Sequence, residues 1–141
     1  MTETPAPILS TRGTQWGLEP QPVAMPTEVV IGSVTYAVTT DSDTWVRFEH
    51  ANKRSGFLGH TDNATAIIYI NPECAPDVAR SALWHEVMHA MCYAVMGGLD
   101  WHHLGKEKSD REETVVSLFE SPIVLVLRDN PGLVAYLTGA S

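Results

Sequence analysis

The sequence predicts an α+β fold, with mainly antiparallel strands in its first half and helices in its second half. Short runs rich in β-branched and aromatic residues, separated by Gly, Asn and Pro, occupy residues 28–70. Apolar residues at helical spacing dominate from residue 76 onward. The chain has 141 residues, the length of one domain, and its hydrophobic content of 44% is enough to form a core.

The first 27 residues are expected to form a flexible, Pro-rich arm outside the core. This segment shows little apolar periodicity and is rich in proline, which favours an extended chain over a packed one. Its prolines are Pro5, Pro7, Pro20, Pro22 and Pro26. The folded domain is therefore expected to span residues 28–141.

The folded part is expected to begin with a β-hairpin. Val29–Ile31 and Val34–Val38 are strand-like runs on either side of the Gly32-Ser33 pair, which suits a tight turn. The segment that follows, residues 44–50, fits either a strand or a short helix.

A second pair of strands is expected over residues 56–59 and 64–70. The run Ala66–Ile70 is the most strand-like in the chain, because it joins β-branched and aromatic residues without a break. Asn71-Pro72 ends this strand.

A long helix is expected to follow. Pro76 and Asp77 suit its first turn, and Gly97-Gly98 suit its end. An apolar stripe at helical spacing should bury one face of the helix. The residues of this stripe are Val78, Leu83, Val87, Ala90, Met91 and Ala94.

Two further helices are expected near the C-terminus. The first begins at Ser109 or Asp110, and Pro122 should kink it or restart it after Ser121. Asn130-Pro131 breaks it again before a last short helix over residues 132–137.

The composition argues against several classes of partner. The net charge is −8 and no long run of Lys or Arg occurs, which disfavours nonspecific binding to nucleic acid or to an anionic membrane. The longest apolar run, Ile123–Leu127, is too short to span a bilayer, and no signal peptide is recognised at the start of the sequence. We therefore expect a cytoplasmic protein, in which Cys74 and Cys92 are reduced thiols without zinc-site spacing.

The strongest functional signal is the segment His85-Glu86-Val87-Met88-His89. Positions i and i+4 of a helix lie on one face, so the two imidazoles can bind the same metal ion. Glu86 lies beside the first histidine and can take a proton from a water molecule on that metal. This pattern is the HExxH motif of zinc hydrolases. The alternative is a helix that carries two unrelated histidines.

Catalytic zinc commonly has three protein ligands and one open position, so a third ligand is needed. A histidine six residues after His89 is ruled out, because Val95 is found there. Asp100 is one alternative, and His102 or His103 is another. The last alternative is a glutamate on the next helix.

Glu112 and Glu113 lie where such a glutamate is expected. Glu112 shares a helical face with Val115, Val116 and Phe119, and a carboxylate on an apolar face needs a partner, which a metal ion can provide. A capping box at the start of the helix could occupy either glutamate instead. The apolar neighbours favour Glu112.

These residues carry a resemblance to a known family. Ala66–Ile70, the helix segment Leu83–Ala90 and the pair Glu112-Glu113 resemble a minimal gluzincin, a zinc metallopeptidase of the HExxH…E type. More narrowly, the chain resembles small metallopeptidases encoded by bacteriophages, which are related in plan to the ImmA/IrrE group. The resemblance covers roughly residues 28–138. It departs from the group at Val115-Val116, where ImmA/IrrE proteins often have Ala and a polar residue.

The resemblance implies a small twisted sheet packed on the HExxH helix. It also implies that the edge strand, here matching Ala64–Ile70, pairs with an extended peptide or protein substrate. One Zn²⁺ per chain, held by His85, His89 and Glu112, would activate a water molecule, with Glu86 as general base.

Several points stay open on the sequence alone. His102, His103 or Tyr93 could stabilise the oxyanion, and the sequence does not choose among them. A zinc-binding regulatory or interaction protein with little or no peptidase activity is the alternative function. A structural zinc domain fits less well, because such sites usually use four ligands that include Cys. The oligomeric state is not indicated.

Overall fold

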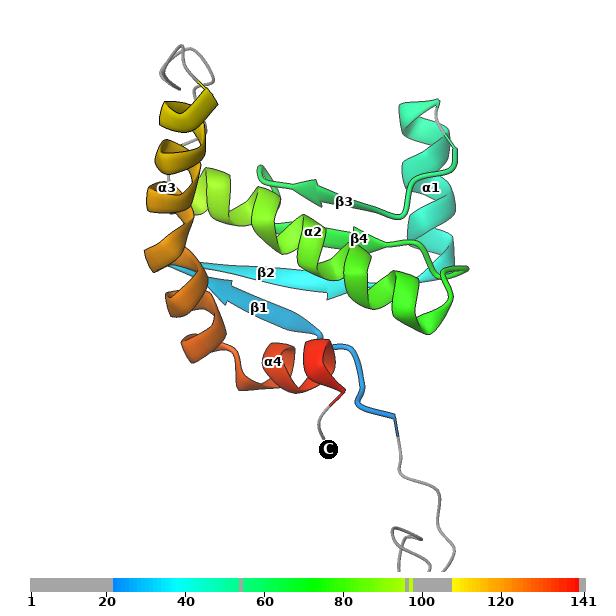
Figure 1. The fold of residues 1–141 in the computed structure, drawn as a ribbon. Coiled ribbons are helices and arrows are strands. Elements are labelled where there is room, and N and C mark those ends of the chain that lie inside the picture. The colour runs from blue at the N-terminus through cyan, green and yellow to red at the C-terminus, as the bar shows by residue number, and fades with distance from the viewer. Residues whose placement is uncertain (1–21, 54, 96, 98–107, 140–141) are drawn as a thin grey trace, which may run out of the picture.

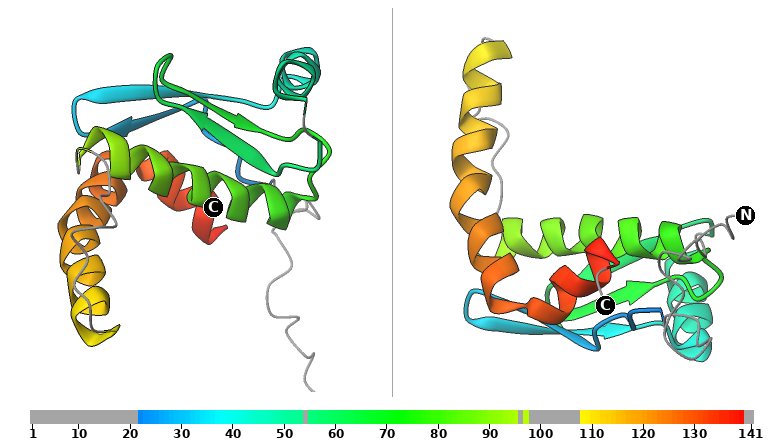
Figure 2. Two further views of the ribbon diagram at one scale, coloured as in Figure 1. Left: turned by 90° about the horizontal axis from the view of Figure 1, so that it is seen from above. Right: turned by 60° about the horizontal axis from the view of Figure 1, so that its bottom comes forward.

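A computed structural model describes residues 22–53, 55–95, 97 and 108–139 of the chain. In this part, the helices α2 and α4 cover one face of a four-stranded sheet (Figures 1 and 2). The helix α3 lies at one end of this helical layer and leads into α4. The helix α1 lies over one end of the opposite face of the sheet. The predicted α+β class is confirmed. Within the described residues, no helix combines the length and the apolar character needed to cross a membrane.

The sheet is mixed and its strands run in the order β1-β2-β4-β3. The strands are β1 (Glu28–Ile31), β2 (Val34–Thr39), β3 (Gly59–Asp62) and β4 (Ile67–Ile70). The pairs β1–β2 and β3–β4 are antiparallel, and β2–β4 is parallel. The sheet is therefore mainly antiparallel, as expected.

The expectation that Ala64–Ile70 forms an edge strand is wrong. β4 lies between β2 and β3, so the edge on that side belongs to β3. The physical reason is that Ile68 and Ile70 are fully buried, whereas the polar sequence of β3 tolerates an edge. An extended peptide that joined the sheet on this side would pair with β3.

The predicted hairpin is confirmed. Ile31 faces Val34 across the turn, and Gly32 adopts a φ of 61°, a left-handed conformation that glycine accepts without strain. The second strand pair is also present, although only Gly59 of the expected segment 56–59 belongs to its strand.

The ambiguous segment 44–50 is helical and belongs to α1 (Ser42–Asn52). Asp41 caps this helix, because its Oδ2 accepts hydrogen bonds from the backbone N–H of Thr44 at 2.8 Å and from the Thr44 hydroxyl at 2.6 Å. Phe48 of α1 stacks on His60 and Tyr69, with ring centroids 4.7 and 5.4 Å apart. These contacts fix α1 on the sheet face opposite α2.

The long helix α2 (Pro76–Ala94) packs along the sheet through Leu83, Val87, Ala90 and Met91, which are buried. Val78, which we expected in the apolar stripe, is instead 39% exposed. Ala79 and Ala82 take its place on the buried face. Ala79 precedes Leu83 by four residues and so shares its face, whereas Val78 is rotated away from it.

The C-terminal helices are α3 (Lys108–Asp129) and α4 (Pro131–Thr138). The predicted break at Asn130-Pro131 is confirmed. Of the two alternatives predicted at Pro122, a kink or a restart after Ser121, the restart is wrong, because α3 is one continuous helix that contains Pro122. Phe119 and Ile123 pack against the core on either side of the proline, and this packing offsets the backbone hydrogen bond that proline cannot donate.

The packed unit extends upstream of residue 28. Val23 and Met25 are partly buried against the core, and the backbone N–H of Val38 donates to the carbonyl of Thr27 at 2.8 Å. The last residues of the expected arm therefore contribute contacts to the domain.

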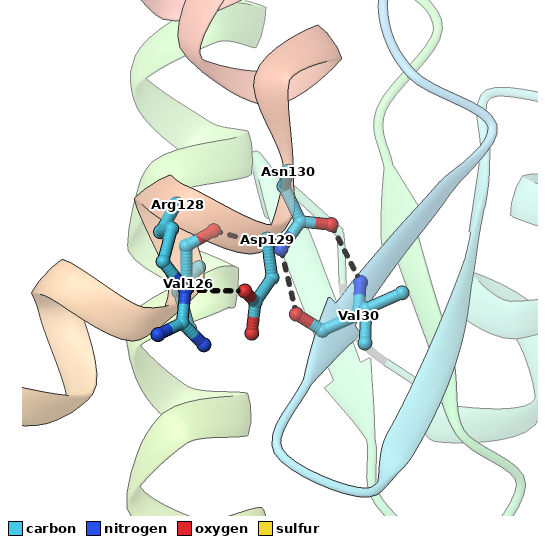
Figure 3. A network of polar contacts seen from close by, with 5 residues as sticks. All are labelled: Val30, Val126, Arg128, Asp129 and Asn130. Carbon is cyan, nitrogen blue, oxygen red and sulfur yellow. Dashed lines mark hydrogen bonds and ion pairs between the residues drawn. The ribbon is translucent and has the colours of Figure 1, made fainter.

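Asn130 connects the junction of α3 and α4 to the outer strand β1 (Figure 3). Its Oδ1 accepts from the backbone N–H of Val30 at 2.7 Å, and its Nδ2 donates to the carbonyls of Val30 at 2.7 Å and Val126 at 2.8 Å. Asn130 is buried, with 8% of its surface exposed. Its amide thus pairs with the edge of β1 as a neighbouring strand would.

Replacing Asn130 with Ala should lower the free energy of unfolding by about 2–3 kcal/mol, because the partly buried backbone groups of Val30 and the buried carbonyl of Val126 lose the side-chain amide as a partner. Urea denaturation monitored by circular dichroism measures this change. Asn52→Ala is the matched control, since it removes one exposed hydrogen bond, which the Asn52 side-chain amide donates to the carbonyl of Phe48. Equal effects of the two substitutions would contradict the role given to Asn130.

Candidate metal centre

The two motif histidines lie side by side on the exposed face of α2, because the opposite face of the helix packs on the sheet. Leu83 and Val87 are fully buried against the sheet, which leaves His85 and His89 exposed. The Nε2 atoms of the two imidazoles are 3.1 Å apart, and the rings meet edge to face with centroids 4.8 Å apart. The Nε2 atoms of both rings thus point to the same place in space.

This separation fits two ligands of one zinc ion. Two nitrogen ligands at about 2.0–2.1 Å from a tetrahedral zinc lie about 3.3 Å from each other. The Nε2 atoms of His85 and His89 are within a few tenths of an ångström of that spacing. The same distance suits a hydrogen bond from one ring N–H to the other ring nitrogen. Only a small opening of the pair is needed to replace the shared proton with a metal ion.

Glu86 differs from its histidine neighbours because it is buried, with 6% of its surface exposed. The hydroxyl of Thr61 lies 2.7 Å from its Oε2 and 2.9 Å from its backbone carbonyl oxygen. Among the described residues, no Lys, Arg or His forms an ion pair with this carboxylate. Burying a carboxylate without an opposite charge costs free energy, so structural stability alone does not explain Glu86 at this position.

The edge strand β3 passes directly over Glu86, and Gly59 makes this close approach possible. A Cβ atom at Gly59 would lie 2.9 Å from Glu86 Cγ, 3.2 Å from its Oε1 and 3.0 Å from the carbonyl oxygen of Tyr69. Any other residue at this position would have to displace the glutamate or the strand. The sequence did not point to Gly59 or Thr61, because their proximity to Glu86 depends on how β3 docks on α2.

A cleft of about 380 Å³ opens beside the motif. His85 and Glu86 both line it. The remaining walls come from the start of β3 with the segment before it, and from the preceding turn of α2, namely Gly56, Phe57, Leu58, Gly59, Ser81 and Ala82. The cleft is of the size that small ligands or single side chains occupy. One exposed imidazole and one buried carboxylate thus face the same open space beside the edge strand.

No described residue lies close enough to the two histidines to complete the expected set of three ligands. In the described ranges, no group of three His, Cys, Asp or Glu side chains could hold a metal ion. Glu112 and Glu113 are exposed in the first turns of α3, and the Glu113 carboxylate accepts a hydrogen bond from Ser117 at 3.4 Å. The assignment of Glu112 therefore stays a prediction.

The other sites named from the sequence are placed as follows. Asp100, His102 and His103 lie outside the described residues. Tyr93 lies near the end of α2 and is 56% exposed, one helical turn beyond His89. The choice of an oxyanion donor therefore stays open.

Both cysteines are free thiols. Burial raises the pKa of Cys74 and of Cys92 above the usual range of a thiol. A raised pKa disfavours the thiolate, the form that binds metals and attacks disulfides. This agrees with the expectation of two reduced thiols.

Comparisons of the chain with protein-family models, with curated proteins and with solved structures found no match. The roles of the residues in this centre are therefore argued from their geometry and chemistry.

Replacing Gly59 with Ala should destabilise the fold by about 1–3 kcal/mol, since the added methyl group meets Glu86 and the carbonyl of Tyr69. Thermal unfolding measures this effect. Gly132→Ala is the matched control, because a Cβ there has no atom within 4 Å, and it should leave stability unchanged or slightly raised. A Gly59→Ala protein as stable as the wild type would refute the close approach of β3 to Glu86.

Glu112→Gln should weaken zinc affinity at least about tenfold, as expected when a charged ligand is lost, and Glu113→Gln should change it little. Competition with a chelating dye, on protein shown to be folded, measures the affinity. The reverse order would assign the ligand to Glu113. No effect of either substitution would direct the search to Asp100, His102 and His103.

Proposed function

We propose that the protein is a zinc-dependent metallopeptidase of the gluzincin type, which hydrolyses peptide bonds with Glu86 as general base. The observation that carries the proposal is the 3.1 Å separation of the Nε2 atoms of His85 and His89, which suits a shared zinc ion. The burial of Glu86 beside that pair, in the same cleft as His85, supports a catalytic rather than a structural use.

His85 and His89 would hold one zinc ion per chain through their Nε2 atoms, with Glu112 as the predicted third ligand. When bound, zinc supplies Lewis acidity that activates a water molecule and polarises a peptide carbonyl. The two imidazoles must be neutral to bind, because a protonated ring nitrogen cannot donate a lone pair.

Glu86 would act as the proton carrier of the reaction. Its carboxylate accepts a proton from the attacking water as the C–O bond forms, and it delivers that proton to the amide nitrogen as the C–N bond breaks. The carboxylate is thus regenerated, and the products are a carboxylic acid and an amine. Burial supports this role because it withdraws the carboxylate from competing bulk water.

The substrate would be an extended peptide or protein segment. Among the described strands, β3 pairs only with β4, and it lies next to both Glu86 and the cleft that His85 lines. A peptide added as a further strand to β3 would run past the motif, with one side chain in the cleft. The free cysteines support action in a reducing compartment such as the cytoplasm, which would be the host cytoplasm for a bacteriophage protein.

A second function is a zinc-binding regulatory or interaction protein with little or no peptidase activity. The observation that favours it is the exposure of His85 and His89 without a third ligand among the described residues. Two ligands alone give a weaker and more exchangeable site than three. Measurements of bound zinc and of hydrolysis separate the two functions.

The purified protein should bind about one zinc per chain, and Glu86→Gln should keep the metal while hydrolysis falls by about 10²–10⁴-fold, because an amide cannot accept the proton. Elemental analysis measures zinc, and release of dye from labelled, unfolded casein measures hydrolysis. Glu73→Gln, which changes an exposed glutamate, is the matched control and should keep full activity.

Three results would contradict the proposal. A protein that takes up no zinc on titration would exclude the metal centre. An active protein in which Glu86→Gln cleaves casein as fast as the wild type would exclude Glu86 as the base, and loss of zinc from that variant would show that Glu86 is a ligand instead.

A further inference from the structure

The carboxylate of Glu86 is held by one residue of the edge strand. Thr61 Oγ1 lies 2.7 Å from Glu86 Oε2, a short separation for a hydroxyl that donates to a charged oxygen. The same hydroxyl lies 2.9 Å from the backbone carbonyl oxygen of Glu86. Because the hydroxyl has a single proton and the carboxylate is the stronger acceptor, the bond to Oε2 is the stronger of the two.

The two carboxylate oxygens of Glu86 differ in their surroundings. Oε2 accepts from Thr61, whereas Oε1 accepts no hydrogen bond from the residues that the structure describes. In that same part of the chain, no fully buried side-chain oxygen lacks a partner, so Oε1 keeps contact with the surface. Glu86 lines the cleft beside His85, and Oε1 is its carboxylate oxygen that Thr61 does not occupy.

The contacts of β3 fix the orientation of the carboxylate. Gly59 and Thr61 are two residues apart and so point to the same face of the strand. The backbone at Gly59 approaches Glu86 Cγ and Oε1, and the Thr61 hydroxyl holds Oε2. A glutamate side chain has three rotatable bonds, and these contacts reduce the number of arrangements open to it.

We propose that Thr61 is a positioning residue for Glu86: its hydroxyl anchors Oε2 so that Oε1 faces the cleft and exchanges the proton. This inference rests on the proposed hydrolytic function and adds the residue that orients its base. The strand that would bind the substrate backbone thereby also aligns the base, so docking of a peptide on β3 and alignment of Glu86 depend on the same segment. Thr61 itself touches neither the metal ligands nor the substrate in this role.

The test compares Thr61→Val, which keeps the shape of the side chain but removes the hydroxyl, with Thr61→Ser, which keeps the hydroxyl. All variants are made in the full chain and loaded with zinc. The readouts are zinc content, melting temperature, and kcat and KM on a quenched-fluorescent peptide taken from a casein cleavage site. Thr35→Val, an exposed threonine of β2, is the matched control and should have wild-type activity.

The expected result is that Thr61→Val keeps about one zinc per chain and its KM, while kcat falls at least about tenfold, because a misplaced base loses its alignment. Thr61→Ser should retain kcat within about threefold of the wild type. A merely structural role would lower the melting temperature without this split between kcat and KM, and without rescue by serine.

The failures are distinguishable. An active wild type with an equally active Thr61→Val overturns the positioning role alone. A zinc-loaded wild type that does not cleave casein overturns the proposed function and, with it, this inference. If Thr61→Val does not fold, a crystal structure of the wild type decides: Thr61 Oγ1 within hydrogen-bond distance of Glu86 Oε2 supports the proposal, and another Glu86 rotamer overturns it.

Discussion

The arrangement of the whole site depends on which face of α2 packs on the sheet. Leu83, Val87 and Ala90 are buried at intervals of four and three residues, which defines one buried face of the helix. That face fixes the rotation of α2 about its axis, so Glu86 has to point toward β3, while His85 and His89 have to point outward. The hydrophobic contacts of the core therefore separate the buried Glu86 from the exposed His85 and His89. A rotation of α2 by one residue would exchange these environments.

The two edges of the sheet differ in how much of their backbone is already hydrogen-bonded. This difference supports the proposal that an extended chain binds at one edge only. Asn130 occupies hydrogen-bonding groups of β1, so that edge offers less to a further strand. β3 forms the opposite edge, beside the cleft lined by His85 and Glu86. Unprotected edges invite aggregation, and proteins usually cover or charge them. The polar side chains of β3 reduce that risk without blocking its backbone.

Much of the fold follows from local sequence, and what does not depends on contacts between distant segments. The hairpin at Gly32 and the helix that starts at Pro76 were predictable, because turn residues and helical periodicity act over a few residues. The interior place of β4 was not, since strand order is decided by pairing across the sheet. The motif itself was visible in the sequence, but Thr61, which lies 25 residues before Glu86, has no local signal that links it to the glutamate. The predicted third ligand likewise has no decisive local signal, because its identity depends on where residues beyond α2 lie in the fold.

The contrast between exposed histidines and a buried glutamate bears on the choice between the two proposed functions. A site that only binds metal gains nothing from a buried carboxylate beside it, because that carboxylate raises the cost of folding. Thr61 offsets part of this cost with one hydrogen bond, and the absence of a side chain at Gly59 leaves space for Glu86. A base, in contrast, benefits from a fixed direction and from a surrounding that excludes bulk water. The buried carboxylate of Glu86 is thus costly for stability, but its burial and fixed direction are what proton transfer would use, and this supports the proposed hydrolysis over metal binding alone.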